Sequence, residues 1–254
     1  MLKESEIAVC ISGLARDGYE TALKNVYKVF PYDTFYLHWD GYGNLNLPNC
    51  LYVKEPEYDY HSTLDTKIKP DCKIWEGVNR KPNLLNNDRG GKMWWKPNYY
   101  NHTKGGSKQL LGHYYLINSL PEKYKLIIRI RYDLIVSTKV NFTPYLEMAQ
   151  DGTTVGFAGS RPGMYGPEQK LTPHFNCNCN MCSGWYLWDN MYFHQRDKFK
   201  NVESLHKEKN LLGAEWGLYQ ILCHQWQNKN FLNVWGGAGI IRYCSAPKEE
   251  WINL

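Results

Sequence analysis

The sequence has no long apolar run and only a small excess of positive charge. No stretch of the 254 residues approaches the roughly 20 consecutive apolar residues of a membrane-spanning helix, so we expect no transmembrane segment. Thirty Lys and Arg residues against 25 Asp and Glu give a formal net charge of +5, and these residues are dispersed along the chain. Nucleic acid is therefore not expected as a partner, although a phosphorylated small molecule suits a mildly positive protein.

Several signatures of nucleotide-dependent and hydrolytic enzymes are also missing. The chain contains no Gly-x-Gly-x-x-Gly fingerprint, no P-loop and no Gly-x-Ser-x-Gly elbow. These motifs position phosphate groups or a nucleophilic serine. Their absence removes the usual support for a dehydrogenase, a kinase or a serine hydrolase.

The first residues lack the apolar core of a secretory signal peptide, because a charged Met-Leu-Lys-Glu start leads into only a short apolar run. We therefore expect a cytoplasmic protein whose eight cysteines are mostly reduced. A hydrophobic content of 43% is sufficient for a packed core. The length suits one α/β domain, which we expect to cover residues 1–254.

Regular hydrophobic patterns begin near the N-terminus. Residues 7–11 form an unbroken apolar run, which is typical of a strand buried on both faces. After a tight loop at 12–16, a helix is predicted with Asp17 as its N-cap and Tyr27 on its apolar face. A second strand at 33–39 completes a β-loop-α-β unit, which implies parallel strands.

Residues 125–136 carry the most unusual pattern of the chain. An apolar run interleaves Arg129, Arg131 and Asp133 with apolar and aromatic residues. In a continuous strand, alternate side chains share a face, so these three charged groups would point the same way. Because buried charges need partners, the three groups either pair with one another or face a ligand. We expect this strand to end in an active site and to bind a diphosphate; an internal Arg–Asp ladder is the alternative.

Polar residues also follow the other two predicted strands. Ser12, Gly13 and Arg16 come after the first, and Asp40 comes directly after the second. Ligands of parallel sheets bind at the carboxyl ends of the strands. We therefore expect these four residues to lie beside the charged stretch.

The remaining chain is less regular. Residues 41–105 are polar but rich in Trp and Tyr, which predicts either a functional loop or a surface excursion that its aromatic side chains attach to the body. We expect helices from Ser107 to Leu120 and from about Leu211 to His224, strands at 155–159, 185–188, 231–235 and 239–244, and a polar, partly helical segment at 192–209.

One cluster has the residue types of a metal site. His174, Cys177, Cys179 and Cys182 provide four potential ligands within nine residues. A structural Zn²⁺ prefers four such groups in a tetrahedron. The Cys-x-Cys step is tighter than the usual zinc spacing, so a disulfide and plain thiols in an acceptor loop remain alternatives.

Three short motifs together resemble one enzyme family. They are Ile-Ala-Val-Cys-Ile-Ser-Gly-x-x-Arg, a second strand that ends His-Trp-Asp, and Ile-Ile-Arg-x-Arg-Tyr-Asp-Leu. With the segment 188–193 and the helix that contains Glu215, they resemble GT-A-type glycosyltransferases. Relatives include enzymes of bacterial lipopolysaccharide synthesis and chlorovirus enzymes that glycosylate the capsids of these algal viruses. The resemblance covers residues 6–225. It implies an α/β, GT-A-like fold with a central, mostly parallel mixed sheet flanked by helices.

The resemblance also implies a nucleotide-sugar half at residues 1–136 and an acceptor half at 137–254. Enzymes of this type usually hold Mn²⁺ or Mg²⁺ with an Asp-x-Asp motif, and Arg131-Tyr132-Asp133 stands at that position here. Asp133 can still ligate a hard cation, whereas Arg129 and Arg131 can neutralise a diphosphate directly.

Further site residues follow from the same resemblance. Ser12, Gly13 and Arg16 would lie near the nucleotide, and Asp40 would lie at its base or ribose. If the transfer inverts the sugar, the acceptor hydroxyl needs a general base. Glu215, at the start of a predicted helix, is the first choice for this base, and Asp189 is the second.

We therefore expect a glycosyltransferase that moves a sugar from a nucleotide-sugar to a glycan hydroxyl of a glycoprotein or surface polysaccharide. The donor would be UDP-linked xylose or a hexose. A viral member of this group would act in the host cytoplasm. The alternatives are a non-catalytic carbohydrate-binding protein on the same scaffold and a zinc-stabilised interaction module.

Overall fold

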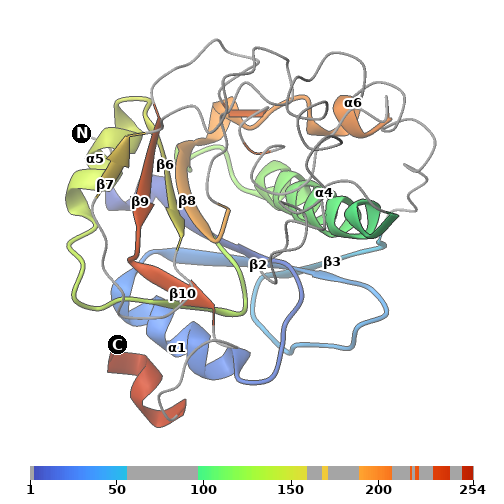
Figure 1. Ribbon diagram of the computed structural model, residues 1–254, viewed down its shortest axis with the longest axis horizontal. Helices are drawn as coiled ribbons and strands as arrows, with labels where there is room; N and C mark the ends of the chain where they lie inside the picture. Colours follow the sequence, from blue (N-terminus) through green and yellow to red (C-terminus); the bar gives the residue numbers. More distant parts are fainter. Residues whose placement is uncertain are drawn as a thin grey trace, which may run out of the picture.

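The computed structural model describes residues 3–55, 97–158, 168–170, 189–207, 218, 221–222, 231–240 and 248–253 (Figure 1). The predicted strand at 185–188 lies outside these residues, as do most of the aromatic side chains of the long 41–105 segment. Among the described residues, no helix is both long and apolar enough to cross a membrane.

The described strands belong to two sheets. They are β1 (Ile7–Ser12), β2 (Asp33–Trp39), β3 (Cys50–Val53), β4 (Leu126–Ile130), β5 (Leu134–Val136), β6 (Thr154–Ala158), β7 (Glu168–Lys170), β8 (Met191–Gln195), β9 (Phe231–Trp235) and β10 (Ala238–Ile240). The α-helices are α1 (Tyr19–Val29), α4 (Pro97–Ser119), α5 (Thr143–Gln150) and α6 (Val202–Lys207), and 3₁₀ turns occur at Glu4–Glu6, Arg196–Lys198 and Lys248–Asn253.

The main sheet has the strand order β3-β2-β1-β4-β8-β6-β9-β7, and β10 pairs with β5 in a second, two-stranded sheet. Parallel pairs are β2–β3, β1–β2, β1–β4 and β6–β9, whereas β4–β8, β6–β8 and β7–β9 are antiparallel. Helices flank this sheet (Figure 1). The predicted α/β fold with a mostly parallel, mixed central sheet is therefore confirmed.

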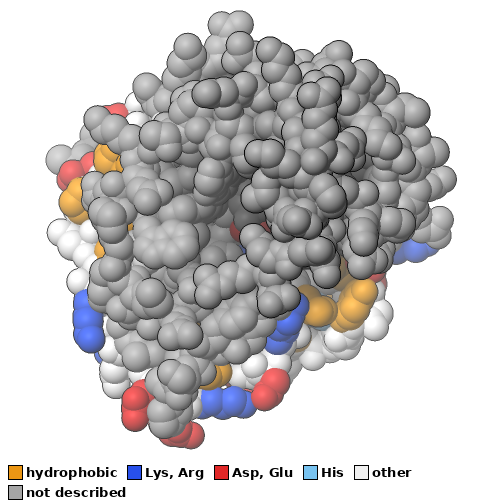
Figure 2. Space-filling model, in the orientation of Figure 1, with side chains coloured by type: hydrophobic (Ala, Val, Ile, Leu, Met, Phe, Trp, Pro, Cys, Tyr) orange, Lys and Arg blue, Asp and Glu red, His pale blue; other side chains and the backbone are white. Residues whose placement is uncertain are grey.

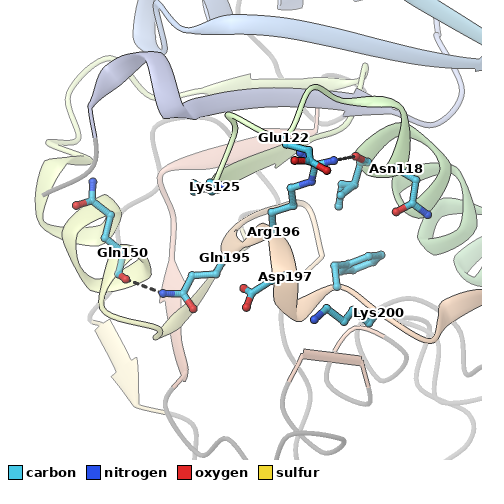
Figure 3. Close-up of a pocket in the computed structure, with 10 residues that line it drawn as sticks. Asn118, Glu122, Lys125, Gln150, Gln195, Arg196, Asp197 and Lys200 are labelled. Atoms are coloured by element: carbon cyan, nitrogen blue, oxygen red, sulfur yellow. Dashed lines mark hydrogen bonds between the residues drawn. The ribbon is translucent and has the colours of Figure 1, made fainter.

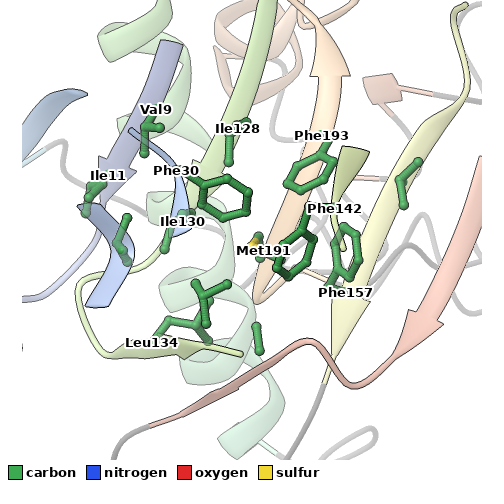
Figure 4. Close-up of a cluster of buried hydrophobic side chains, with 14 of the residues drawn as sticks. Val9, Ile11, Phe30, Ile128, Ile130, Leu134, Phe142, Phe157, Met191 and Phe193 are labelled. Atoms are coloured by element: carbon green, nitrogen blue, oxygen red, sulfur yellow. The ribbon is translucent and has the colours of Figure 1, made fainter. Parts of the chain in front are cut away.

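Alternate side chains of the central strands fill two apolar cores on opposite faces of the sheet. Ile7, Val9 and Ile11 of β1 pack with Ile128 and Ile130 of β4 in the larger core, which α1 and α5 cover (Figure 4). The residues between them, such as Ala8, Cys10 and Ile127, face the second core beneath α4. Such alternation is the normal consequence of a strand buried on both faces.

The charged stretch at 125–136 is not one strand, and this prediction is wrong. β4 ends at Ile130, residues 131–133 form a turn, and the chain resumes as β5, which pairs with β10 outside the main sheet. Within the turn, the guanidinium of Arg131 bonds the carboxylate of Asp133, two residues later. The hydroxyl of Tyr132 donates to the carbonyl of Leu37 at 3.1 Å. These side-chain bonds stabilise the turn in place of a continued strand.

Two details of the first helix also differ from the prediction. The N-cap is Gly18, at φ 84°, and not Asp17, whose carboxylate instead lies 2.9 Å from the ammonium group of Lys248. Tyr27 is 39% exposed, so the buried face is narrower than predicted.

Other predicted elements are confirmed with shifted bounds. The helix predicted from Ser107 begins ten residues earlier, at Pro97. Residues 192–195, expected in a polar segment, belong to β8, a central strand of the main sheet. The polar pattern misled the prediction because the side chain of His194 is buried against a second histidine rather than exposed.

A buried asparagine attaches α1 to the segment after β4. The Asn25 side-chain amide donates to the carbonyl of Val136 at 2.9 Å and to that of Trp251 at 3.1 Å, and its oxygen accepts from the N–H of Val136 at 2.7 Å. Asn25 therefore satisfies both backbone groups of Val136, at the end of β5, and one carbonyl near the C-terminus.

We expect Asn25→Ala to lower the free energy of unfolding by about 2–4 kcal/mol, because several buried backbone groups lose their partner. Urea unfolding followed by circular dichroism measures this change. Lys24→Ala, on the exposed face of the same helix, is the matched control and should change the stability little. Equal effects of the two substitutions would contradict the assigned role.

Two buried histidines form a hydrogen-bonded pair between α4 and β8. Their Nε2 atoms lie 2.9 Å apart, and Nδ1 of His194 lies 2.8 Å from the carbonyl of Gln195. Since a carbonyl only accepts, Nδ1 of His194 carries the proton, and Nε2 of His113 is the donor within the pair. Burial lowers the pKa of His113 well below its ordinary value and lowers the pKa of His194 to about 4. The pair is therefore neutral at pH 7.

This pair should make the protein less stable in mild acid. Between pH 6.5 and about 4, the unfolded chain binds protons at both histidines while the folded chain does not, so the free energy of unfolding falls as the pH falls. The share of His194 is roughly 3 kcal/mol. Urea midpoints at pH 7.5 and 4.5 test this. Replacing both histidines by Gln should reduce the difference, and a wild-type midpoint that is constant over this range would refute it.

Candidate functional site

The polar residues predicted at three strand ends do lie at one edge of the main sheet. The loop with Gly13 and Arg16 follows β1, Asp40 follows β2, and the turn at 131–133 follows β4; these strands are parallel. β8 runs in the opposite direction, and its first residue, Met191, pairs with Ile130. Asp189, two residues before the start of β8, is therefore at the same edge.

The buried carboxylate of Asp133 lies against two guanidiniums. Oδ1 and Oδ2 accept hydrogen bonds from Nε and Nη2 of Arg131, at 2.8 and 2.9 Å, and Oδ2 lies 3.4 Å from Nε of Arg16. The side chains of Asp133, Arg131 and Arg16 are 2%, 17% and 44% exposed. We call these three residues the arginine cluster. Two guanidiniums and one carboxylate give these three side chains together a net charge of +1, and Arg16 is the most exposed of the three.

The loop after β1 leaves room next to this cluster. Gly13 has a φ of 127°, which favours glycine, and a Cβ placed there would meet no atom of the described residues within 4 Å. Ser12, directly before it, is buried, and its hydroxyl has no hydrogen-bond partner among the described residues. A ligand can therefore approach the backbone of this loop closely.

Arg129 belongs to the other face of the sheet. Alternation along β4 directs it, like Ile127, toward α4. Its Nη1 donates to the carbonyl of Asp189 at 2.5 Å, its Nη2 donates to Oε1 of Gln109 at 3.2 Å, and its guanidinium lies over the ring of Tyr192. The side chain is fully buried, and its Nε has no partner in the described part of the chain. Arg129 thus connects β4 to α4 and to the segment before β8.

Aromatic side chains extend from the arginine cluster along β2 and β3. The ring centroids of Tyr132 and His38 lie 6.2 Å apart. The centroid of the His38 ring lies 6.4 Å from that of Tyr42 and 6.2 Å from that of Tyr52. Tyr42 is 51% exposed, and Leu14, after β1, is also exposed. In the space-filling view, a few hydrophobic and Lys or Arg side chains are visible at the lower right, on the side of the molecule where β3 lies (Figure 2). Tyr42, Tyr52 and Gln109 were not predicted at this edge, since nothing in their local sequence patterns relates them to it.

Of the other predicted site residues, Asp40 makes no hydrogen bond or ion pair with the arginine cluster in the described part of the chain, and the rest lie outside the described residues. Asp40 is exposed, and its N–H donates to the carbonyl of Val53 at 2.9 Å. Glu215 and the cluster of His174, Cys177, Cys179 and Cys182 are outside the described part of the chain.

The described residues of the site do not fit a divalent cation. Such an ion takes carboxylate oxygens directly, but both oxygens of Asp133 are bonded to Arg131, and Arg16 adds a second positive group. No group of three or more His, Cys, Asp or Glu side chains is suitably placed for a metal within the described ranges.

A pocket of about 540 Å³ lies at the opposite edge of the sheet (Figure 3). Lys125, directly before β4, and Gln195, at the end of β8, contribute to its lining. The guanidinium of Arg196 donates to the carbonyls of Ile117, Leu120 and Pro121, at 3.1, 2.8 and 2.6 Å. Arg196 therefore caps the C-terminal end of α4, and the pocket is separate from the arginine cluster.

Comparison with known proteins shows low similarity throughout. No protein-family model matches the chain, and no curated protein matches its sequence. Solved structures that match include 4-diphosphocytidyl-2C-methyl-D-erythritol synthase from Anaerococcus prevotii, at 9% identity and a TM-score of 0.42, covering 98% of this chain and 94% of that one. Another is a glycosyltransferase involved in glycosylation of the major capsid of PBCV-1, at 8% identity and a TM-score of 0.37, covering 97% and 96%. A third is mannose-1-phosphate geranyltransferase from Thermus thermophilus, at 12% identity and a TM-score of 0.39. This match covers 91% of this chain and 74% of that one.

These similarities are too low to assign a function. What this chain does must therefore be inferred from its own residues.

Proposed function

We propose that this chain is a glycosyltransferase that binds a nucleotide-sugar, UDP-linked xylose or a hexose, at the carboxyl edge of β1, β2 and β4. The arginine cluster is the observation that carries the proposal. Guanidiniums bind the oxygens of a diphosphate in a planar, two-pronged manner, and Asp133 holds that of Arg131 in a fixed orientation. The cluster also lies where open α/β sheets bind their ligands.

The neighbouring residues suit the rest of a nucleotide. The open space at Gly13 allows a phosphate to approach the backbone after β1. The exposed ring of Tyr42, in the aromatic group with His38 and Tyr52, offers a surface on which a base can stack. Asp40, exposed at the end of β2, is available for hydroxyl groups of the ribose.

In the proposed reaction, the bond between the anomeric carbon and the diphosphate oxygen breaks, and the oxygen of a glycan hydroxyl bonds to that carbon. The nucleoside diphosphate leaves with the electron pair, and the arginine cluster stabilises the negative charge that develops on it. If the sugar is inverted, the proton of the hydroxyl passes to a general base. Asp189 is our candidate among the described residues because it precedes β8 at the same edge; Glu215 is the other candidate.

Turnover of a panel of nucleotide-sugars, with and without glycan acceptors, tests the function. We expect release of a nucleoside diphosphate from at least one UDP-sugar. We also expect Asp189→Asn to lower this rate about 100-fold or more, as for loss of a general base, while UDP binding changes by less than about 3-fold. Full activity of Asp189→Asn would move the base to Glu215. Binding of glycans without binding of any nucleotide would instead indicate a carbohydrate-binding protein.

Arg129 should affect turnover through the segment before β8. Because its guanidinium bonds the carbonyl of Asp189, we expect Arg129→Met to lower kcat about 10-fold or more, with UDP affinity within about 3-fold of wild type. Steady-state kinetics and calorimetry with UDP separate the two effects. The matched comparison is Arg131→Gln, which should weaken UDP binding. If Arg129→Met weakens UDP binding as strongly, Arg129 contacts the nucleotide itself.

A further inference from the structure

We infer that the site binds its nucleoside diphosphate without a divalent cation, because Arg16 and Arg131 supply the positive charge that Mn²⁺ or Mg²⁺ would otherwise provide. This inference rests on the proposed function and specifies how that site recognises its ligand. It departs from the expectation, taken from the family resemblance, that Asp133 is a metal ligand.

The first support is the hydrogen bonding of Asp133. A hard cation in such a site binds carboxylate oxygens and phosphate oxygens together. Here, Nε and Nη2 of Arg131 take one oxygen each, at 2.8 and 2.9 Å, and Nε of Arg16 lies 3.4 Å from Oδ2. A metal ion at either oxygen would therefore share that oxygen with a positively charged guanidinium, which repels it.

The second support is the balance of charge. Among the described residues, the charged groups that lie against Asp133 are the guanidiniums of Arg131 and Arg16, so a cation brought to this carboxylate would meet two positive groups. A diphosphate, in contrast, is attracted by the same two guanidiniums. Arg16 is the most exposed member of the cluster, so an anion can reach it without displacing Asp133.

The third support is preorganisation. Asp133 is almost completely buried, and its two-pronged bond fixes the plane of the Arg131 guanidinium before any ligand binds. A fixed cationic group loses little side-chain freedom on binding, which favours affinity. The open space at Gly13, on the adjacent loop, allows phosphate oxygens close to these groups.

The experiment is calorimetric titration with UDP in metal-stripped buffer containing EDTA and, separately, in buffer containing MnCl₂ or MgCl₂. We expect dissociation constants that agree within about 2-fold between the buffers. In EDTA, Arg16→Gln and Arg131→Gln should each weaken UDP binding about 10–100-fold, the usual effect of losing a charged hydrogen bond. Lys125→Gln is the matched control, because it removes the same charge at the opposite edge of the sheet and should leave affinity within about 2-fold.

The outcomes separate this inference from the proposed function. Binding of UDP only when Mn²⁺ or Mg²⁺ is present overturns the metal-free site but leaves the glycosyltransferase proposal intact. The metal-free site is also overturned if UDP binds in EDTA but Arg16→Gln and Arg131→Gln weaken this binding no more than Lys125→Gln does. If no nucleoside diphosphate binds in any of the buffers, both the inference and the proposed function fail. Thermal unfolding of each variant shows that it is folded, and Arg16→Gln, at the most exposed position, keeps the test valid if Arg131→Gln is unstable.

Discussion

The carboxylate of Asp133 is buried at the end of the central strand, and a charge in that position has to be neutralised. Arg131 neutralises it from only two residues away, which requires a turn rather than a strand, and Arg16 approaches from the loop after β1. The pair thus helps to end β4 at Ile130. The chain then leaves the main sheet as β5, which β10 and Asn25 hold in place. The pairing of the buried Asp133 carboxylate therefore helps to fix where the site lies and where the chain goes after it.

Because β4 ends at Ile130, Arg129 and Arg131 make different contacts. Arg129 is the one charged residue of β4, so its side chain follows the alternation of the strand and faces α4. Arg131 comes after the strand ends, so no alternation applies to it, and it bonds Asp133 instead. Arg129 bonds the carbonyl of Asp189, whereas Arg131 and Arg16 lie against the carboxylate of Asp133. The two sets of contacts are adjacent in sequence and lie on different faces of the sheet.

β8 contributes to the site by its direction. It is antiparallel to β4, so its beginning lies beside the carboxyl end of β4, and a carboxylate from far along the chain reaches the edge formed by the first half. β8 also contacts α4, through the hydrogen bond between His113 of α4 and His194 of β8. Arg129 of β4 bonds α4 through Gln109. The polar groups buried between α4 and the sheet therefore fix the relative position of the helix and the strand that flank the candidate active site.

Some of these features were determined by the sequence alone. The parallel unit of β1, α1 and β2 follows from an unbroken apolar run, a 3.6-residue period and a second apolar run, because these patterns reflect local burial. The same patterns placed Arg16 and Asp40 at strand ends and indicated that charges at 129–133 need partners. Only the tertiary structure decided which partners they have, since the contacts of Arg129 with Gln109 and Asp189 join residues 20 and 60 positions apart. It also decided that 191–195 is a central strand, because His194 is polar in the sequence but buried through a bond to a distant histidine. Burial of a polar side chain depends on a partner elsewhere in the chain, and no local pattern of the sequence specifies that partner.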